Sequence, residues 1–210
     1  MKPFAICAAL LLSLTTSTFA ANLLVNPGFE DPVTQDGPPF IGFWEAFNSG
    51  GSTAANSTLM PRTGAQSLQL SINNTVNTFA GAFQDVGGLA SGMSFSLGGW
   101  HATTSSPLSL GVEVRIEWRN SISNTEISRT PNATPIPGLS YAQFGFDGFV
   151  PAGADTARIV YAIQSFSTNP LGNGTVYVDD MSFAVVPEPS SIALLSVGGL
   201  ALLAFRRRQS

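Results

Sequence analysis

The strongest constraint on the fold is a strict alternation of apolar and charged residues between positions 112 and 119. The apolar set is Val112, Val114, Ile116 and Trp118, and the charged set is Glu113, Arg115, Glu117 and Arg119. Successive side chains of a β-strand point to opposite faces, so the segment predicts a strand with one face in a core. Trp118 is in phase with the apolar positions and is assigned to that core. The charged face is interpreted as a ladder of alternating charge at the surface.

The rest of the segment between residues 22 and 184 has the same short-strand character. It shows no helical period, and clusters of Gly, Pro, Asn and Ser divide it into short runs. Further strands are expected at residues 67–72, 79–86, 93–97, 157–163 and 175–178. The proline-rich segment 130–138 is expected to be a loop. This pattern is typical of a single β-sandwich, and about 165 residues are enough to bury a core without disulfides.

The N-terminus has the three parts of a secretory signal peptide. Met1-Lys2-Pro3 is charged, residues 4–14 are apolar, and Thr18 and Ala20 are small residues before a cut after Ala20. The apolar run is about half the ~20 residues that span a bilayer, so we expect residues 1–20 to be cleaved rather than retained as an anchor. The single cysteine, Cys7, lies in this run, so the mature domain has none. Its stability must come from a large core or from a bound metal.

The C-terminus also has three parts: a short motif, an apolar segment and a basic cluster. The motif is Pro187-Glu188-Pro189, residues 192–205 are largely apolar, and Arg206, Arg207 and Arg208 follow. Fourteen residues at ~1.5 Å each give about 21 Å of helix, which is short of a ~30 Å hydrocarbon core. The arginines are expected to stay on the cytoplasmic side. The segment is therefore expected to be a short hydrophobic helix that pauses in the membrane.

This three-part order resembles the PEP-CTERM sorting signal of Gram-negative bacteria, over residues 185–210. The resemblance implies processing by an exosortase in the inner membrane, where the precursor is held transiently. It also implies delivery to the cell surface or into the extracellular polysaccharide matrix of a biofilm. A plain C-terminal tail anchor is the alternative for the same residues.

Charge is distributed unevenly along the chain. Four of the nine basic residues lie at the two ends, whereas all thirteen acidic residues lie between Glu30 and Glu188. The central domain is therefore more acidic than the formal net charge of −4 for the whole chain indicates. A surface of that sign repels phosphate backbones, so nucleic-acid binding is excluded. It also argues against direct attraction to an acidic polysaccharide without a bridging cation.

A second resemblance covers nearly all of residues 22–184. The segment 22–30 (NLLVNPGFE) looks like the opening strand of carbohydrate-binding-module jelly rolls of the galactose-binding-like type. Further pieces follow in the family's order, at residues 62–68, 84–100, 150–154 and 176–181. The resemblance implies an all-β jelly-roll β-sandwich between the two terminal signals. It implies less about a ligand, because such folds carry many different sites.

The same resemblance implies a structural calcium site. In that family, a Glu near the first strand and an Asp near the last strand help to hold Ca²⁺ together with backbone carbonyls. The matching residues here are Glu30 and Asp180, with Asp179 as a further candidate. Oxygen ligands suit Ca²⁺, which is abundant outside the cell. The alternative is that these acids are solvated at strand ends without a metal.

Sugar binding usually needs an aromatic ring that stacks on a pyranose and polar groups for its hydroxyls. Trp100 and Trp44 are the candidate ring platforms. Trp100 follows Gly98-Gly99, where a β-bulge would re-aim the side chain, and Trp44 lies in a region rich in proline and glycine. A core or rim position is the alternative for both tryptophans.

Catalysis has little support in the sequence. The chain has one histidine, His101, and no nucleophile elbow. Glu113 and Glu117 share a strand face but lie roughly 13 Å apart at ~3.3 Å per residue, farther than a glycosidase pair. We therefore expect an exported, non-catalytic surface or matrix protein whose jelly roll binds glycan. The alternatives are a structural or adhesive matrix protein without a sugar site and, third, a glycan hydrolase.

Overall fold

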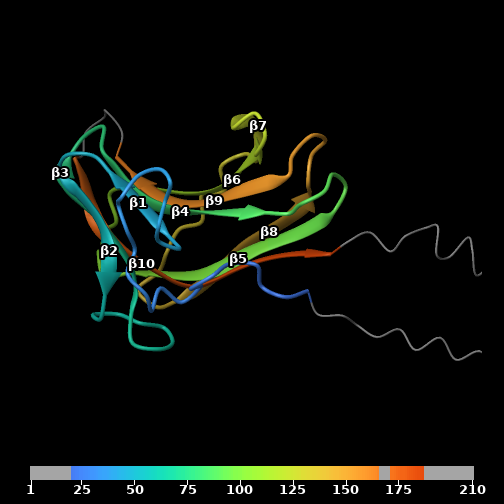
Figure 1. Cartoon of the computed structure of the whole chain (residues 1–210). Coiled ribbons are helices and arrows are strands. Elements are labelled where there is room, and N and C mark those ends of the chain that lie inside the picture. Colours follow the sequence, from blue (N-terminus) through green and yellow to red (C-terminus); the bar gives the residue numbers. More distant parts are fainter. Residues whose placement is uncertain (1–19, 166–170, 187–210) are drawn as a thin grey trace, which may run out of the picture.

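The computed structural model describes residues 20–165 and 171–186, which form two antiparallel sheets of five strands each (Figure 1). Sheet A has the order β1 (Glu45–Asn48), β4 (Phe79–Gly87), β9 (Thr156–Gln164), β6 (Gly111–Asn120) and β7 (Thr125–Arg129). Sheet B has the order β2 (Ser52–Ser57), β3 (Ser67–Thr75), β10 (Gly172–Val186), β5 (Ser94–Thr103) and β8 (Ala142–Phe149). The described residues contain no helix, and the expected all-β jelly-roll sandwich is confirmed.

Every strand expected from the two-residue period is present. β6 covers the alternating segment, and β3, β4, β5, β9 and β10 cover the other expected strands. Residues 130–138 form the predicted loop, with an isolated bridge between Ala133 and Val114. The two-residue period therefore predicts where these strands lie in the sequence. It does not predict which strands pair, because pairs such as β4 and β9 are far apart in the chain.

The core lies between the two sheets and is built from the inward face of each strand. All four apolar residues of the alternating segment are buried. As expected, Trp118 belongs to this core, where it packs on Phe95 of β5 with ring centroids 5.2 Å apart. Phe95 in turn packs on Phe183 of β10, at 6.0 Å. Burial of large apolar side chains is the main stabilising contribution to a domain that has no disulfide.

The segment 22–30 is not the opening strand that the sequence predicts. Asn26 and Phe29 have φ of 52° and 55°, which turns the chain out of an extended conformation. The segment still lies beside the last strand: Leu23 N donates to Phe183 O at 2.7 Å, and the Asn22 side chain bonds both Met181 O and Phe183 N. It therefore lies along β10 as an irregular segment, and the first strand among the described residues is β1.

The last strand leaves no linker before the sorting motif. β10 runs to Val186, which pairs with Ser94 of β5, so the residues directly before Pro187 belong to sheet B. The expected signal peptide and the residues from Pro187 onward lie outside the described residues. No helix within 20–165 and 171–186 is long and apolar enough to cross a membrane.

Candidate functional site

The outer face of sheet A carries a pocket of 420 Å³, here called the sheet-A pocket. Its lining residues are Phe47, Phe79, Glu113, Arg115, Arg129, Asn132, Ala162, Ile163 and Gln164. Strand register places Phe47, Gly81, Ala162 and Glu113 in one row across β1, β4, β9 and β6. Because Gly81 and Ala162 are small, the middle of this row is low and its ends carry long side chains. The row therefore separates an aromatic wall from a polar wall.

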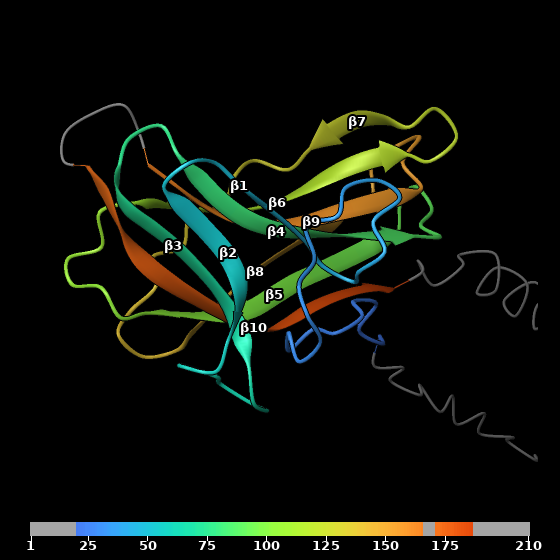
Figure 2. The same ribbon diagram turned by 60° about the vertical axis from the view of Figure 1, so that its left-hand side comes forward.

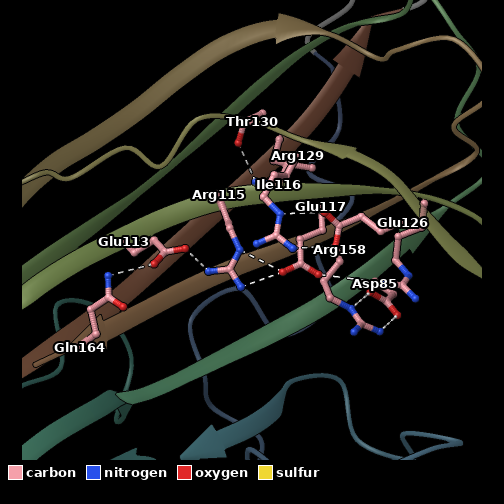
Figure 3. Close-up of polar contacts among 11 residues, drawn as sticks. Asp85, Glu113, Arg115, Ile116, Glu117, Glu126, Arg129, Thr130, Arg158 and Gln164 are labelled. Carbon is pink, nitrogen blue, oxygen red and sulfur yellow. Dashed lines mark hydrogen bonds and ion pairs between the residues drawn. The ribbon is translucent and has the colours of Figure 1, made fainter. Parts of the chain in front are cut away.

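Arg115 organises the polar wall on β6 (Figure 3). Its guanidinium bonds Glu113 on one side and donates two hydrogen bonds to Glu117 Oε1, at 2.9 and 2.7 Å, on the other. Gln164 of β9 donates from Nε2 to the second oxygen of Glu113, at 3.3 Å. Both glutamates are only 8% exposed. The alternating charges of β6 therefore form a largely buried network rather than the solvent-exposed ladder that the sequence suggested.

Phe47 of β1 and Phe79 of β4 form the aromatic wall, with ring centroids 6.0 Å apart. Phe47 lies directly over Gly81, since a Cβ atom at that glycine would be 2.4 Å from Phe47 Cζ. Phe79 is 45% exposed, so much of its ring is open to solvent. The aromatic wall thus offers a flat apolar surface. It faces the hydrogen-bonding side chains of the polar wall across Gly81 and Ala162.

A second arginine fixes the neighbouring part of this face. Arg158 of β9 donates two hydrogen bonds to Asp85 of β4, at 2.7 and 2.8 Å, and these bonds raise the pKa of the guanidinium above its usual value. The same guanidinium lies 3.9 Å from the centroid of the Phe83 ring. Phe40 packs edge-on against Phe83, with centroids 5.2 Å apart. Phe83 is therefore held in place beside Phe47, at 6.3 Å.

Each arginine that lines the pocket is paired with a carboxylate. Arg115 binds Glu113 and Glu117, and Arg129 at the end of β7 binds Glu126 through two hydrogen bonds, at 2.7 and 2.8 Å. The pocket therefore presents donors and acceptors that are held by ion pairs, and each of its two arginines has a carboxylate partner. Such an arrangement suits a ligand that has hydroxyl groups along its edge and an apolar face for the aromatic wall.

The predicted platform Trp44 does not reach any surface. Its side chain has no exposed area, packs on Phe29 with centroids 4.9 Å apart, and donates from Nε1 to Asn26 O at 2.9 Å. A fully buried ring cannot stack on a sugar, so the prediction of Trp44 as a ligand platform is wrong. The core alternative is the observed one.

Trp100 lies on the outer face of sheet B, on the opposite side of the sandwich from the sheet-A pocket. It is half-buried, because the guanidinium of Arg62 lies 3.8 Å from its ring centroid. The expected bulge is not at Gly98-Gly99 in β5. It is in β10, where the register with β5 shifts between Asp179 and Ser182. Trp100 stays a predicted sugar platform, and the structure brings it together with neither Trp44 nor the pocket.

The three predicted calcium ligands surround one loop, residues 62–66. Asp179 Oδ2 accepts hydrogen bonds from Arg62 N and Thr63 N, at 2.7 and 3.2 Å. Glu30 accepts from the amides of residues 65 and 66, at 3.0 and 3.2 Å. Asp180 binds the Arg62 guanidinium and accepts from the Thr63 hydroxyl at 2.6 Å. The three acids therefore lie together around this loop.

Their oxygens face peptide N–H groups and a guanidinium rather than a common point. Among residues 20–165 and 171–186, no cluster of three or more acidic, histidine or cysteine side chains is arranged to hold a metal ion. Asp179 is fully buried, and this desolvation raises its pKa. As they stand, the three acids do not fit the expected Ca²⁺ site, and calcium binding stays an untested prediction.

His101 does not form a catalytic site. Its side chain is buried in the core, where Nδ1 lies 2.7 Å from the hydroxyl of Tyr161. Burial lowers the pKa of His101 to about 4 and raises the pKa of Tyr161. A histidine in this position has no access to a substrate, which leaves Ser-His-Asp chemistry without its base.

Sequence reasoning missed the aromatic wall. In residues 79–83 (FAGAF), Phe79 and Phe83 fall on one strand face, and Ala80 and Ala82 fall on the other. A simple hydrophobic argument places the phenylalanines in the core, whereas Ala80 and Ala82 are the buried residues. This pattern was a usable signal for a strand with two different faces. Which face points into the core depends on how closely the two sheets pack, and the sequence does not give that spacing.

The chain folds as a two-sheet β-sandwich that is similar to solved carbohydrate-binding modules. The CBM22-2 xylan-binding domain of Paenibacillus barcinonensis Xyn10C is 18% identical, with a TM-score of 0.54 over 78% of this chain and 99% of that one. A CBM4 structure gives 18% identity and a TM-score of 0.53, again over 78% and 99%. At these identities the likeness shows the fold.

A third neighbour is the enzymatically active domain of tailspike protein 4 from bacteriophage CBA120. It is 16% identical, with a TM-score of 0.58 over 79% of this chain. This chain covers only 21% of the tailspike chain, so the tailspike's activity does not transfer with the fold.

Residues 185–208 match the PEP-CTERM protein-sorting motif. This confirms the resemblance carried by Pro187-Glu188-Pro189 and the arginine cluster. The motif marks a secreted surface protein that is processed at the membrane. No curated protein sequence matches the chain.

Proposed function

We propose that the sheet-A pocket binds a neutral glycan and that the domain is not an enzyme. The observation that carries the proposal is the pair of facing walls, with Phe47 and Phe79 opposite the Arg115 network. A sugar ring has an apolar C–H face and an edge of hydroxyls, so it matches both walls at once. The fold supports the proposal at the level of the scaffold, because solved carbohydrate-binding modules share it.

Binding at this pocket requires little rearrangement. Phe79 offers an open ring for stacking, and Gln164 has amide groups beside Glu113 that can bond sugar hydroxyls. The salt bridges of Arg115 already hold the acceptor oxygens in place. Side chains that are fixed before binding lose less conformational entropy when the ligand arrives.

The charges favour a neutral over an acidic glycan. Arg115 and Arg129 are each neutralised by a carboxylate partner, so neither offers an unpaired cation to a uronate or sulfate group. The acidic residues of the domain add an unfavourable field for polyanions.

A hydrolase is the weaker candidate. A glycosidase needs one carboxyl group that donates a proton to the leaving oxygen. Glu113 and Glu117 instead accept hydrogen bonds from the same guanidinium, which suits acceptors of hydroxyl groups. A binding role therefore uses these residues as they are arranged.

The sorting motif supplies the location. We propose that a signal peptide at 1–20 exports the chain and that an exosortase-type enzyme processes the 185–208 motif at the inner membrane of a Gram-negative bacterium. The domain would then act at the cell surface or in the exopolysaccharide matrix of a biofilm. Glycan binding by the sheet-A pocket would retain it there.

Affinity electrophoresis in gels that contain one polysaccharide each tests this function. We expect retardation by at least one neutral glycan, such as xylan, β-glucan or galactan, and none by alginate. Phe79→Ala should abolish the retardation, whereas Trp100→Ala on the other sheet should leave it unchanged. If only Trp100→Ala abolishes it, the site lies on sheet B. If no glycan retards the unsubstituted protein, the structural or adhesive alternative is favoured.

A further inference from the structure

One end of the sandwich, here called the exit end, carries both termini of the described chain. Val186, Ser94 and Phe149 are paired in one row across β10, β5 and β8. Adjacent strands lie about 4.8 Å apart, so Phe149 is about 10 Å from Val186, which directly precedes Pro187-Glu188-Pro189. Ala20 lines a 470 Å³ pocket together with Phe149 and Ala184. Residues 20 and 186, from which the two apolar terminal segments continue, therefore both lie at this end (Figure 1).

Two loops form a rim at the exit end, residues 120–124 and 149–154. The Asn120 side chain donates to Gly153 O at 3.2 Å, which ties the loops together, and Val150 N donates to Met93 O at 2.9 Å beside the start of β5. Figure 2 shows the β6–β7 turn and the end of β10 on the same side of the sandwich. The two loops thus form one surface beside the end of β10.

This rim displays apolar side chains, and the carboxylate of Asp155, directly after the second loop, accepts hydrogen bonds from Ser121 N and Oγ at 2.8 and 2.7 Å. Ile122 is 93% exposed and Phe149 is 68% exposed. Neither loop contains an acidic or a basic residue. Exposed apolar side chains can enter a lipid headgroup region, and these two loops carry no cation that would select anionic lipids.

The C-terminal segment keeps the rim close to the membrane surface. Five residues, 187–191, separate Val186 from the apolar segment that starts at Ile192. A fully extended chain gains at most ~3.6 Å per residue, so the rim stays within about 18 Å of a bilayer that holds this segment. Tethering at so short a distance gives a high effective concentration, and a weak apolar contact is then sufficient for docking.

We propose that Ile122 and Phe149 contact the lipid surface while the precursor is tethered by its C-terminal segment. The contact supplies a second, weak membrane signal beside a hydrophobic segment that is too short to fit the bilayer well. After the tail is removed, two apolar side chains do not hold the domain at the membrane, so the domain leaves. The inference rests on the sorting motif and is independent of the glycan pocket.

The experiment uses the full chain with Cys7→Ser, reconstituted into phosphatidylcholine and phosphatidylethanolamine vesicles that contain doxyl-labelled lipid. A fluorophore is placed at Ser123→Cys in the rim or, as the matched control, at Ile136→Cys. Ile136 is 85% exposed and precedes Gly138, which pairs with Thr103 at the far end of β5. We expect the lipid quencher to reduce the rim fluorescence at least about twofold more than the control fluorescence.

The substitutions Ile122→Ser and Phe149→Ser together should remove this excess quenching, while vesicle flotation shows that the tail still holds the chain. Equal quenching at the two positions, or quenching unchanged by the double substitution, would overturn the proposal. Failure of the unsubstituted chain to float would overturn it as well. Retardation by glycan should be the same with and without the double substitution, so the two proposals fail separately.

Discussion

The guanidinium of Arg62 lies 3.8 Å from the centroid of the Trp100 ring while it also binds the carboxylate of Asp180. It thereby connects the 62–66 loop to β5 and β10. Glu30 and Asp179 hold the same loop through its amide groups. Protein groups therefore clasp the loop at the place where the family resemblance implies a calcium ion.

From this clasp we expect Ca²⁺ to leave the stability of the protein unchanged. An ion that binds the native state raises the unfolding temperature, and these carboxylate oxygens already have donors. Thermal unfolding in excess EDTA and in millimolar CaCl₂ should differ by less than about 1 °C. A calcium-dependent rise of several degrees would establish the calcium site after all.

Arg62→Ala tests whether the guanidinium of Arg62 takes the place of a calcium ion beside these acids. Loss of the partly exposed ion pair and of the ring contact should lower the unfolding free energy by about 1 kcal/mol and the unfolding temperature by about 2–4 °C. Without the guanidinium the neighbouring acids repel one another, so Ca²⁺ should now raise the unfolding temperature. Arg129→Ala, which removes an arginine paired with Glu126 on β7, is the control and should not respond to calcium.

The fold was predictable because period-two patterning is a local property. The alternation at 112–119 gives β6 directly, and the apolar positions of β9 give its buried face. The opening segment was not predictable in the same way. Its apolar residues resemble a strand, but Asn26 and Phe29 have positive φ values. The segment bonds β10, more than a hundred residues away in sequence, and Phe29 packs on Trp44, 15 residues away. Such contacts cannot be read from a local pattern.

The candidate site was less predictable because it is assembled from five strands. Glu113 and Gln164 belong to different strands, and only the register of β6 with β9 brings them together. Tryptophan was the wrong guide to the aromatic wall. Trp44 is in the core, whereas Phe79 is exposed because Ala80 and Ala82 fill the limited space between the sheets.

Trp44→Phe should destabilise the protein without changing glycan retardation. The substitution removes the hydrogen bond to Asn26 O and leaves a cavity beside Phe29. Together these losses should lower the unfolding free energy by about 2–4 kcal/mol in chemical denaturation. A loss of retardation with unchanged stability would instead place Trp44 at the binding surface.

Gly81→Ala should weaken both the pocket and the fold. The new Cβ atom would lie 2.7 Å from the backbone oxygen of Tyr161, which cannot move away, as well as against Phe47. We expect a loss of roughly 1–3 kcal/mol in stability and reduced retardation by the bound glycan, because Phe47 is displaced from the aromatic wall. Denaturant titration and affinity electrophoresis measure the two effects.

Gly87→Ala on the same strand is the matched control. A Cβ atom there meets only Thr156 Oγ1, at 3.9 Å, which is an ordinary contact. Stability should change by less than about 0.5 kcal/mol and retardation should not change. If the two variants behave alike, Phe47 does not depend on the space above Gly81.

The buried pair of His101 and Tyr161 predicts a pH dependence of stability. Burial lowers the pKa of His101 to about 4 from an ordinary value of 6.5, so between these values the unfolded chain binds a proton that the folded chain excludes. The unfolding free energy should therefore decrease as the pH falls from 6.5 toward 4, by about 1.4 kcal/mol per unit and about 3 kcal/mol in total. Denaturant unfolding at a series of pH values measures this slope.

His101→Gln should remove most of that slope, because the chain contains no other histidine and glutamine can still bond the Tyr161 hydroxyl. Asp179 acts in the opposite direction, since its raised pKa favours the folded state as it becomes protonated. The effect of Asp179 on the unfolding free energy falls at the acidic end of the pH range, where carboxyl groups take up protons. The comparison of the two proteins between pH 6.5 and 5 therefore isolates the histidine, and equal slopes there would mean that His101 is protonated in the folded protein.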